Sequence, residues 1–179
     1  MRKQILGLVA LFGLSSAPLV AQVDYNNEFR HNEVKLNLGG ILTKSVELQY
    51  DYIWREDMSA GVDLALAIGD FNEYAFTVLP NYRWFFGGNS RSQQKYGAGF
   101  FIEANGAVFR FRGGNPTRNS ESEPKSEMVT CAGLGLAVGW KYLSTGNWVG
   151  EIFIGGGRNF ATEGPVFYPR GGLMIGYRF

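Results

Sequence analysis

The side chains that could do chemistry in this sequence are mainly ionic, and they sit singly between apolar neighbours. Glu103 lies in FIEANG, Glu151 in GEIFI and Arg178 in GYRF. A nucleophilic serine or cysteine would need a histidine beside it as a base. The only histidine, His31, has no serine or aspartate near it in a recognisable triad pattern. We therefore expect no catalytic residue and no enzyme activity.

The sequence offers neither a metal-ligand set nor a nucleotide-binding loop. The only cysteine, Cys131, excludes an intrachain disulfide, and by its parity we expect it to face the interior as a small filler. The glycine runs GLGLAVG and GGG lie within predicted strands and precede no helix, unlike nucleotide loops. We therefore expect no cofactor and no metal. A formal net charge of +1 gives no electrostatic footprint for nucleic acid.

The elements that carry these residues are predicted strands, because apolar residues recur with period two. The segments are about 10 to 15 residues long, whereas strands of globular proteins are nearer five or six. A strand that crosses an outer membrane at a tilt needs about 9 to 11 residues. We expect strands at 32–42, 46–55, 58–69, 74–86, 96–111, 128–143, 147–157 and 167–179.

The two faces of these strands differ in charge. The more apolar face carries no ionic residue in any segment, as lipid requires, because Lys or Arg at the membrane midplane costs about 2–4 kcal/mol. The opposite face carries the ionic residues with small ones between them, which suits the narrow interior of an eight-stranded barrel. A soluble barrel would have no reason for a polar face rich in glycine and alanine. We therefore predict an all-β, eight-stranded, antiparallel up-and-down transmembrane β-barrel.

We expect the ionic residues to pair inside the barrel, because buried charges must be paired or hydrated. The pairs should centre on Glu103 and Glu151, with Arg83, Lys141 and Arg178 as partners. The expected lumen charge network is Lys35, Glu47, Asp51, Asp63, Arg83, Glu103, Lys141, Glu151 and Arg178, and Arg55 and Arg170 share its face. We favour a plug that holds the barrel, and a narrow path for ions or protons is the alternative.

The tryptophans and the N-terminal segment predict an orientation. Residues 1–21 have the basic start, apolar centre and small-residue end of a secretory signal peptide, which leaves a barrel domain at 22–179. With both termini in the periplasm, the tryptophans form an interfacial girdle at the periplasmic edge. They are Trp54, Trp84, Trp140 and Trp148.

The final segment, RGGLMIGYRF, predicts a strand that closes the barrel against the first one. Its Tyr177 and Phe179 resemble the C-terminal signal read by the barrel-assembly machinery, which with outer-membrane lipid would be a partner. Pro80 lies inside a predicted strand, so we expect a bulge or an absent ladder bond there. The polar segment 112–127 is a candidate site for an extracellular ligand, or only a solvated tip.

Seven motifs occur in order along the chain and cover nearly all of the region after the signal peptide. They are NEVKLNLGG, VELQYDYIWREDMSAGV, NYRWFFG, GAGFFIEANG, GLGLAVGWKY, IGGGRNF and RGGLMIGYRF. The ordered set resembles a family of small outer-membrane β-barrels from Bacteroidota, known chiefly as a domain of unknown function. The resemblance implies the same fold and location, and no activity. We therefore expect a structural or surface-interaction role without catalysis. The alternatives are a narrow channel for ions or small solutes and a lipid-modifying barrel enzyme.

Overall fold

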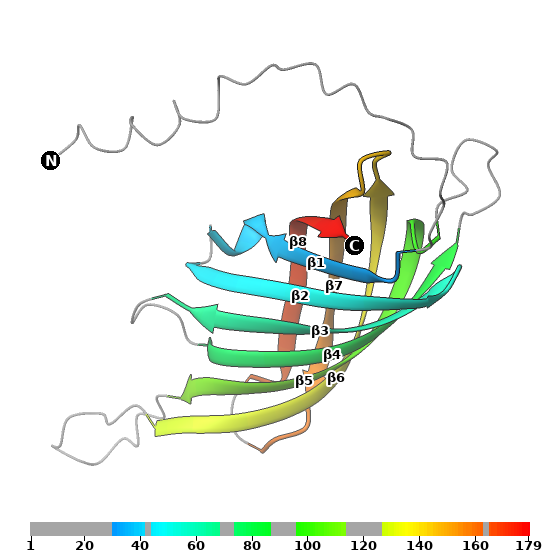
Figure 1. Cartoon of the computed structure of the whole chain (residues 1–179). Coiled ribbons are helices and arrows are strands. Elements are labelled where there is room, and N and C mark those ends of the chain that lie inside the picture. Colours follow the sequence, from blue (N-terminus) through cyan, green and yellow to red (C-terminus); the bar gives the residue numbers. More distant parts are fainter. Residues whose placement is uncertain (1–29, 42–43, 69–73, 87–95, 114–126, 163–164) are drawn as a thin grey trace, which may run out of the picture.

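The strands that the sequence predicts form a closed antiparallel barrel in the computed structural model (Figure 1). The structure describes residues 30–41, 44–68, 74–86, 96–113, 127–162 and 165–179. The predicted signal peptide, 1–21, therefore lies outside the described residues. The strands are β1 (Asn32–Asn37), β2 (Ser45–Arg55), β3 (Met58–Ala67), β4 (Tyr74–Phe86), β5 (Gly99–Gly113), β6 (Glu127–Leu143), β7 (Trp148–Asn159) and β8 (Phe167–Arg178). The predicted eight-stranded fold is confirmed.

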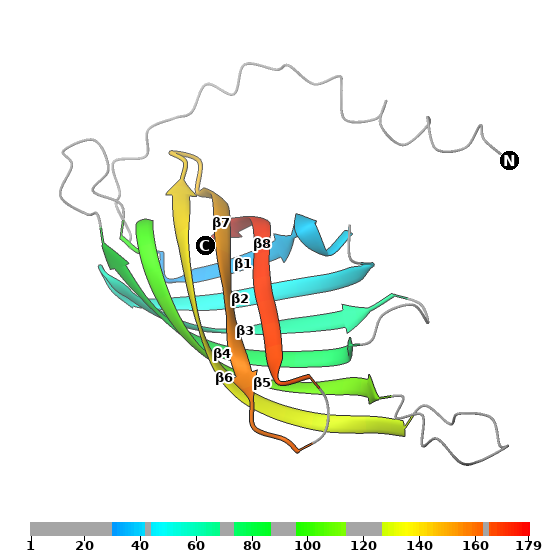
Figure 2. The same cartoon turned by 180° about the vertical axis from the view of Figure 1, so that it is seen from behind.

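Closure depends on the pairing of β8 with β1, which lie side by side in Figures 1 and 2. The register runs from Glu33 opposite Arg178 to Asn37 opposite Met174. Beyond β8, the backbone N–H of Phe179 donates to the carbonyl of Asn32 at 2.8 Å. Because every strand has a neighbour on both sides, the described sheet has no edge at which backbone groups would be left unpaired.

The first and fifth strands are shorter at one end than the sequence predicts, and local turns explain both differences. The chain leaves β1 after Asn37 and forms a 3-10 turn, η2 (Leu38–Ile41), because the Asn37 side chain accepts the N–H of Gly39 at 2.9 Å. The fifth strand begins at Gly99 rather than at residue 96, because Gly97 and Gly99 have φ of 56° and 98°.

A register shift near the end of β2 overturns one expectation. The pairing of β2 with β3 slips between Ile53 and Arg55, as at a β-bulge, which re-aims the side chains that follow it. Ile53 is fully buried in the interior, whereas Arg55 is exposed and its guanidinium lies 5.1 Å from the ring of Trp54. The expected interior position of Arg55 is therefore wrong.

Pro80 interrupts one ladder without shifting it. The pairing of β4 with β3 continues through Val62 opposite Pro80. The pairing with β5 stops after Val78 and resumes at Asn81 in the same register, so Pro80 forms no pair on that side. Of the two expected outcomes, the structure has the missing ladder pair and not a bulge at Pro80, because the absent N–H donor falls on the β5 side.

The barrel has two distinct ends. We call the end that holds Asn32, Phe179 and the Glu56–Asp57 hairpin the terminal end, and the end that holds η2 the loop end. The four tryptophans lie toward the terminal end: Trp54 precedes its hairpin, and the others pair with Met58, Phe100 and Tyr177. Among the described residues, no helix is long and apolar enough to span a membrane.

The two faces of the wall have opposite character. Leu64, Leu136 and Ile175 point outward, with exposed fractions of 46%, 63% and 44%. Arg83 and Glu103 point inward and are fully buried. The usual arrangement of a water-soluble protein, with apolar side chains inside and ionic ones outside, is therefore reversed.

Candidate functional site

Arg83, on β4, is the centre of the interior. Its Nε donates to Glu103 Oε2 at 2.8 Å, and its Nη1 donates to Glu151 Oε2 at 2.9 Å and to Asp51 Oδ2 at 3.2 Å. The guanidinium also lies over the ring of Phe101, 4.6 Å from its centroid. One buried cation thus joins carboxylates from β2, β5 and β7, which suits the planar, multi-donor geometry of arginine.

The pairs continue from this centre toward the terminal end. Lys35 Nζ donates to Asp51 Oδ2 at 2.7 Å and to Glu151 Oε2 at 2.8 Å. Glu33 then accepts from Lys141 Nζ at 2.8 Å and from Arg178 Nε at 2.7 Å.

Arg178 also contacts the backbone of residues 96–97 at the terminal end. Its Nη1 and Nη2 donate to the carbonyls of Tyr96 and Gly97, at 2.6 Å and 3.1 Å. The N–H of Gly97 donates in turn to the carbonyl of Glu56 at 2.7 Å. Residues 96–97 are thereby tied across this mouth, where Gly97 lies against the side chain of the buried Ile53.

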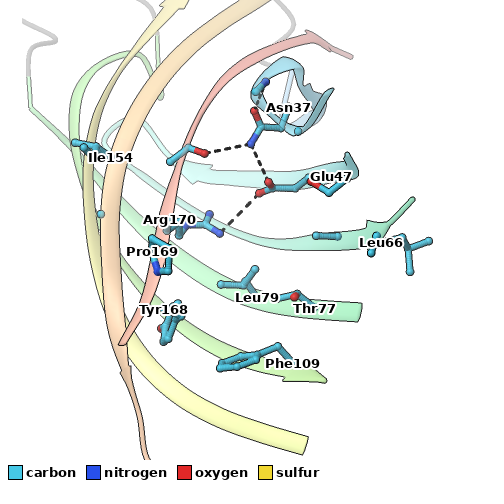
Figure 3. Close-up of a pocket in the computed structure, with 17 residues that line it drawn as sticks. Asn37, Glu47, Leu66, Thr77, Leu79, Phe109, Ile154, Tyr168, Pro169 and Arg170 are labelled. Atoms are coloured by element: carbon cyan, nitrogen blue, oxygen red, sulfur yellow. Dashed lines mark hydrogen bonds and ion pairs between the residues drawn. The ribbon is translucent and has the colours of Figure 1, made fainter. Parts of the chain in front are cut away.

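Arg170, on β8, carries the pairs toward the loop end. It forms ion pairs with Asp63 and, through Nε at 2.8 Å, with Glu103 Oε1. Its Nη1 lies 4.0 Å from Glu47 Oε1. The other oxygen of Glu47 accepts from Asn37 Nδ2 at 2.8 Å, and Figure 3 shows these three side chains converging from β1, β2 and β8.

The buried charges of the described residues balance. We call them the buried ionic network: Glu33, Lys35, Asp51, Asp63, Arg83, Glu103, Lys141, Glu151, Arg170 and Arg178. The network has five cations and five carboxylates, so it is neutral in its fully ionised form. Glu47 lies at its loop-end border with 15% of its side chain exposed, and it is one carboxylate in excess.

The structure brings the sequence-predicted charges together and pairs Glu103 and Glu151 with Arg83 as expected, but it places the other two expected cations elsewhere. The expected partners of Glu103 and Glu151 included Lys141 and Arg178, and both cations instead contact Glu33. Glu33 was missed, although it has the same parity as Lys35 and begins the same strand. It was overlooked because it is only the second residue of the predicted strand 32–42.

Aromatic side chains in the interior were also missed. One buried cluster, nearer the terminal end, consists of Phe85, Phe101, Ala137, Phe153 and Met174. A second cluster consists of Leu79, Ala107, Phe109, Cys131 and Tyr168. The runs WFF, GFFI and IFI hold apolar residues on both faces of their strands. Because neighbouring residues of a strand point to opposite faces, each run had to place an apolar side chain in the interior. These runs were the available signal.

Glycines make room for the network at two close approaches. A Cβ on Gly61 would overlap the Asp51 carboxylate, and a Cβ on Gly176 would overlap Lys35 Cγ. No small shift relieves either overlap, because the neighbouring backbone carbonyls are also close. Small residues are therefore needed where long charged ones turn inward.

A cavity of about 620 Å³ lies at the loop end, above the network. Leu79, Phe109 and Tyr168 supply an apolar wall, and Glu47 and Arg170 supply the polar floor (Figure 3). His31 lies at the other end, where its Nδ1 is 2.6 Å from the carbonyl of Ile53. The described residues include no group of three or more potential metal ligands.

Comparison with known proteins shows a similar fold. No family model and no curated protein matches the chain. The structure is similar to the crystal structure of the N-terminal β-barrel domain of Pseudomonas aeruginosa OprF, with a TM-score of 0.59 and 15% sequence identity. The match covers 84% of this chain and 98% of the OprF chain. It supports the barrel architecture described above.

Glu33→Gln is expected to lower the free energy of unfolding by about 3–5 kcal/mol, because it leaves Lys141 and Arg178 without their shared carboxylate. Denaturant titration of the refolded barrel in detergent measures the change. Glu56→Gln, an exposed hairpin carboxylate, is the control and should change stability by less than about 0.5 kcal/mol. Equal stability of the two variants would contradict the role given to Glu33.

Gly176→Ala should destabilise the barrel by about 1–3 kcal/mol, because the added methyl group overpacks against Lys35 and the Val34 carbonyl. Gly150→Ala is the matched control, since no atom lies within 4 Å of the position its Cβ would take. Unfolding midpoints in urea compare the two. A Gly176 variant as stable as the Gly150 variant would show that the interior has more room than the structure indicates.

Proposed function

We propose that this chain is an outer-membrane β-barrel with a structural or surface-interaction role and no catalytic activity. The observation that carries the proposal is the reversal of the two faces. An apolar exterior such as that of Leu136 and Ile154 is unfavourable in water, and the interior is ionic. Lipid around the wall removes the cost of exposing apolar side chains to water. Pairing within the network offsets the cost of burying charges.

The height of the apolar exterior supports lipid as the medium around the wall. Trp148 and Arg158 mark its two limits on β7, ten residues apart. At about 3.4 Å per residue and a tilt of about 40°, this stretch spans about 26 Å. Outer-membrane barrels carry an apolar band about 25 Å tall.

The described interior favours a sealed anchor over a channel. The network runs along the axis from Arg178 to Arg170, and its side chains are buried rather than lining an open path. The ties of Arg178 to residues 96–97 obstruct the terminal end. The lipid-modifying alternative has less support, because the only histidine, His31, contacts the carbonyl of Ile53 and is stacked on Tyr52.

Orientation and assembly complete the proposal. Residues 1–21 would direct export, both termini would be periplasmic, and the tryptophans would lie at the periplasmic interface. Tyr177 and Phe179 point outward at the end of β8, where the barrel-assembly machinery could read them. The segment 112–127, of which 114–126 lie outside the described residues, would face the cell exterior and could bind a ligand there. Membership of the Bacteroidota family remains part of this proposal.

Ile152→Arg should reduce folding stability in lipid bilayers by about 2–4 kcal/mol, because the charge would sit near the midplane. Phe160→Arg is the matched control: it has nearly the same exposure, 62% against 61%, and lies beyond Arg158 at the limit of the band. Its expected cost is about 0–1 kcal/mol. Denaturant unfolding in bilayers and heat-modifiable gel mobility measure both. Equal effects of the two variants would argue against a membrane around this wall.

The wild-type barrel is expected to be electrically silent in planar lipid bilayers, because the buried ionic network fills the interior. Recordings at several voltages test this. A steady conductance that changes in Glu103→Gln would contradict the sealed anchor and support the channel alternative.

A further inference from the structure

The cavity at the loop end is not needed by an anchor. The network below it is already neutral and packed, and a structural plug could fill the remaining space with side chains as it does elsewhere. Its volume of about 620 Å³ is in the range of small-molecule sites. Such sites combine an apolar wall with a few convergent polar groups, and both are present here.

The charge at the floor of the cavity determines which ligand charge is favoured there. In their fully ionised forms the ten groups of the buried ionic network balance, and Glu47 adds one negative charge beside the cavity. Its contacts are the neutral amide of Asn37 at 2.8 Å and Arg170 at 4.0 Å. Arg170 is already paired with Asp63 and Glu103, so it only partly compensates Glu47. A protonated amine would complete the balance.

The apolar wall of the cavity favours a ligand that also has an apolar part. The rings of Phe109 and Tyr168 lie 5.7 Å apart, and Leu79 packs in the same cluster. The Tyr168 hydroxyl donates to Asn105 at 2.9 Å, so its hydrogen is used within the protein. The aromatic rings also favour a nearby cation electrostatically.

Arg170 lines the cavity, its side chain is 4% exposed, and its Nη1 makes no hydrogen bond in the structure. This Nη1 is too deeply buried for a ligand in the cavity to reach, and it lies 4.0 Å from Glu47 Oε1, so it sets no further requirement on the ligand.

We propose that this cavity binds a small amphipathic organic cation, with its protonated amine on Glu47 and its aromatic or aliphatic body against Leu79, Phe109 and Tyr168. The binding chemistry follows from the cavity itself. That the ligand arrives from the cell exterior rests on the proposed function, because only then does the loop end face outward.

The test uses the full-length barrel, refolded in lipid nanodiscs, and three probes that share a phenylethyl group: 2-phenylethylamine, 2-phenylethanol and 3-phenylpropanoate. Ligand-observed NMR, with empty nanodiscs to subtract partition into lipid, measures the affinity of each. The amine is expected to bind saturably and at least about tenfold more tightly than the alcohol, which corresponds to about 1.4 kcal/mol. Tighter binding of the carboxylate, or no saturable binding of the amine, would overturn the proposal.

Variants locate the site. Glu47→Gln should weaken amine binding about tenfold or more and leave the alcohol unchanged, and Ala65→Leu, which narrows the cavity beside Glu47, should weaken both. Glu56→Gln at the opposite end is the control and should bind as wild type. Heat-modifiable mobility reports whether each variant is folded in lipid. A folded Glu47→Gln barrel with unchanged amine affinity would refute the site, whereas a wild type that binds the amine but does not insert would refute only the membrane proposal.

Discussion

The structure depends on the neutralisation of ten ionic side chains inside a narrow cylinder. An unpaired charge there would be very costly, and a paired one contributes little net stability compared with an apolar residue of the same shape. What the pairs do provide is register. Arg83 reaches carboxylates on β2, β5 and β7, and a slip of one residue in any of these strands would turn its carboxylate outward. The ion pairs of the network can therefore form only when these strands pair in the correct register.

The interior is divided rather than uniformly polar. β1 to β4 supply most of the buried amides, and β5 to β8 supply most of the buried aromatic and aliphatic side chains. Three of the cations, Arg83, Lys141 and Arg170, each lie over a phenylalanine ring, at 4.6 Å, 4.6 Å and 5.1 Å. The rings exclude water from one side of each cation while the carboxylates hold the other, which strengthens both contacts.

Much of this arrangement was predictable from the sequence, because period two fixes the face of each residue once the strands are known. The closed eight-stranded fold followed from that pattern, as did the inward direction of Arg83 and Glu103. The pattern failed where the backbone departs from period two, as at the register shift before Arg55. It could not choose between faces in WFF or IFI, where both are apolar. It also could not say which carboxylate meets which cation, because the tilt of the strands, and not their order, sets the heights of Glu33 and Lys141.

If the barrel is a sealed anchor, as proposed, the ties of Arg178 to Tyr96 and Gly97 at one end and the cavity at the other would make the described interior a vessel with a base and a mouth. Exchange with such a vessel is one-sided: a solute must leave by the route through which it entered. Its occupancy then follows the concentration in one compartment and is indifferent to the other. A barrel of this shape can sample the medium at its mouth, but it cannot relieve a gradient across the wall.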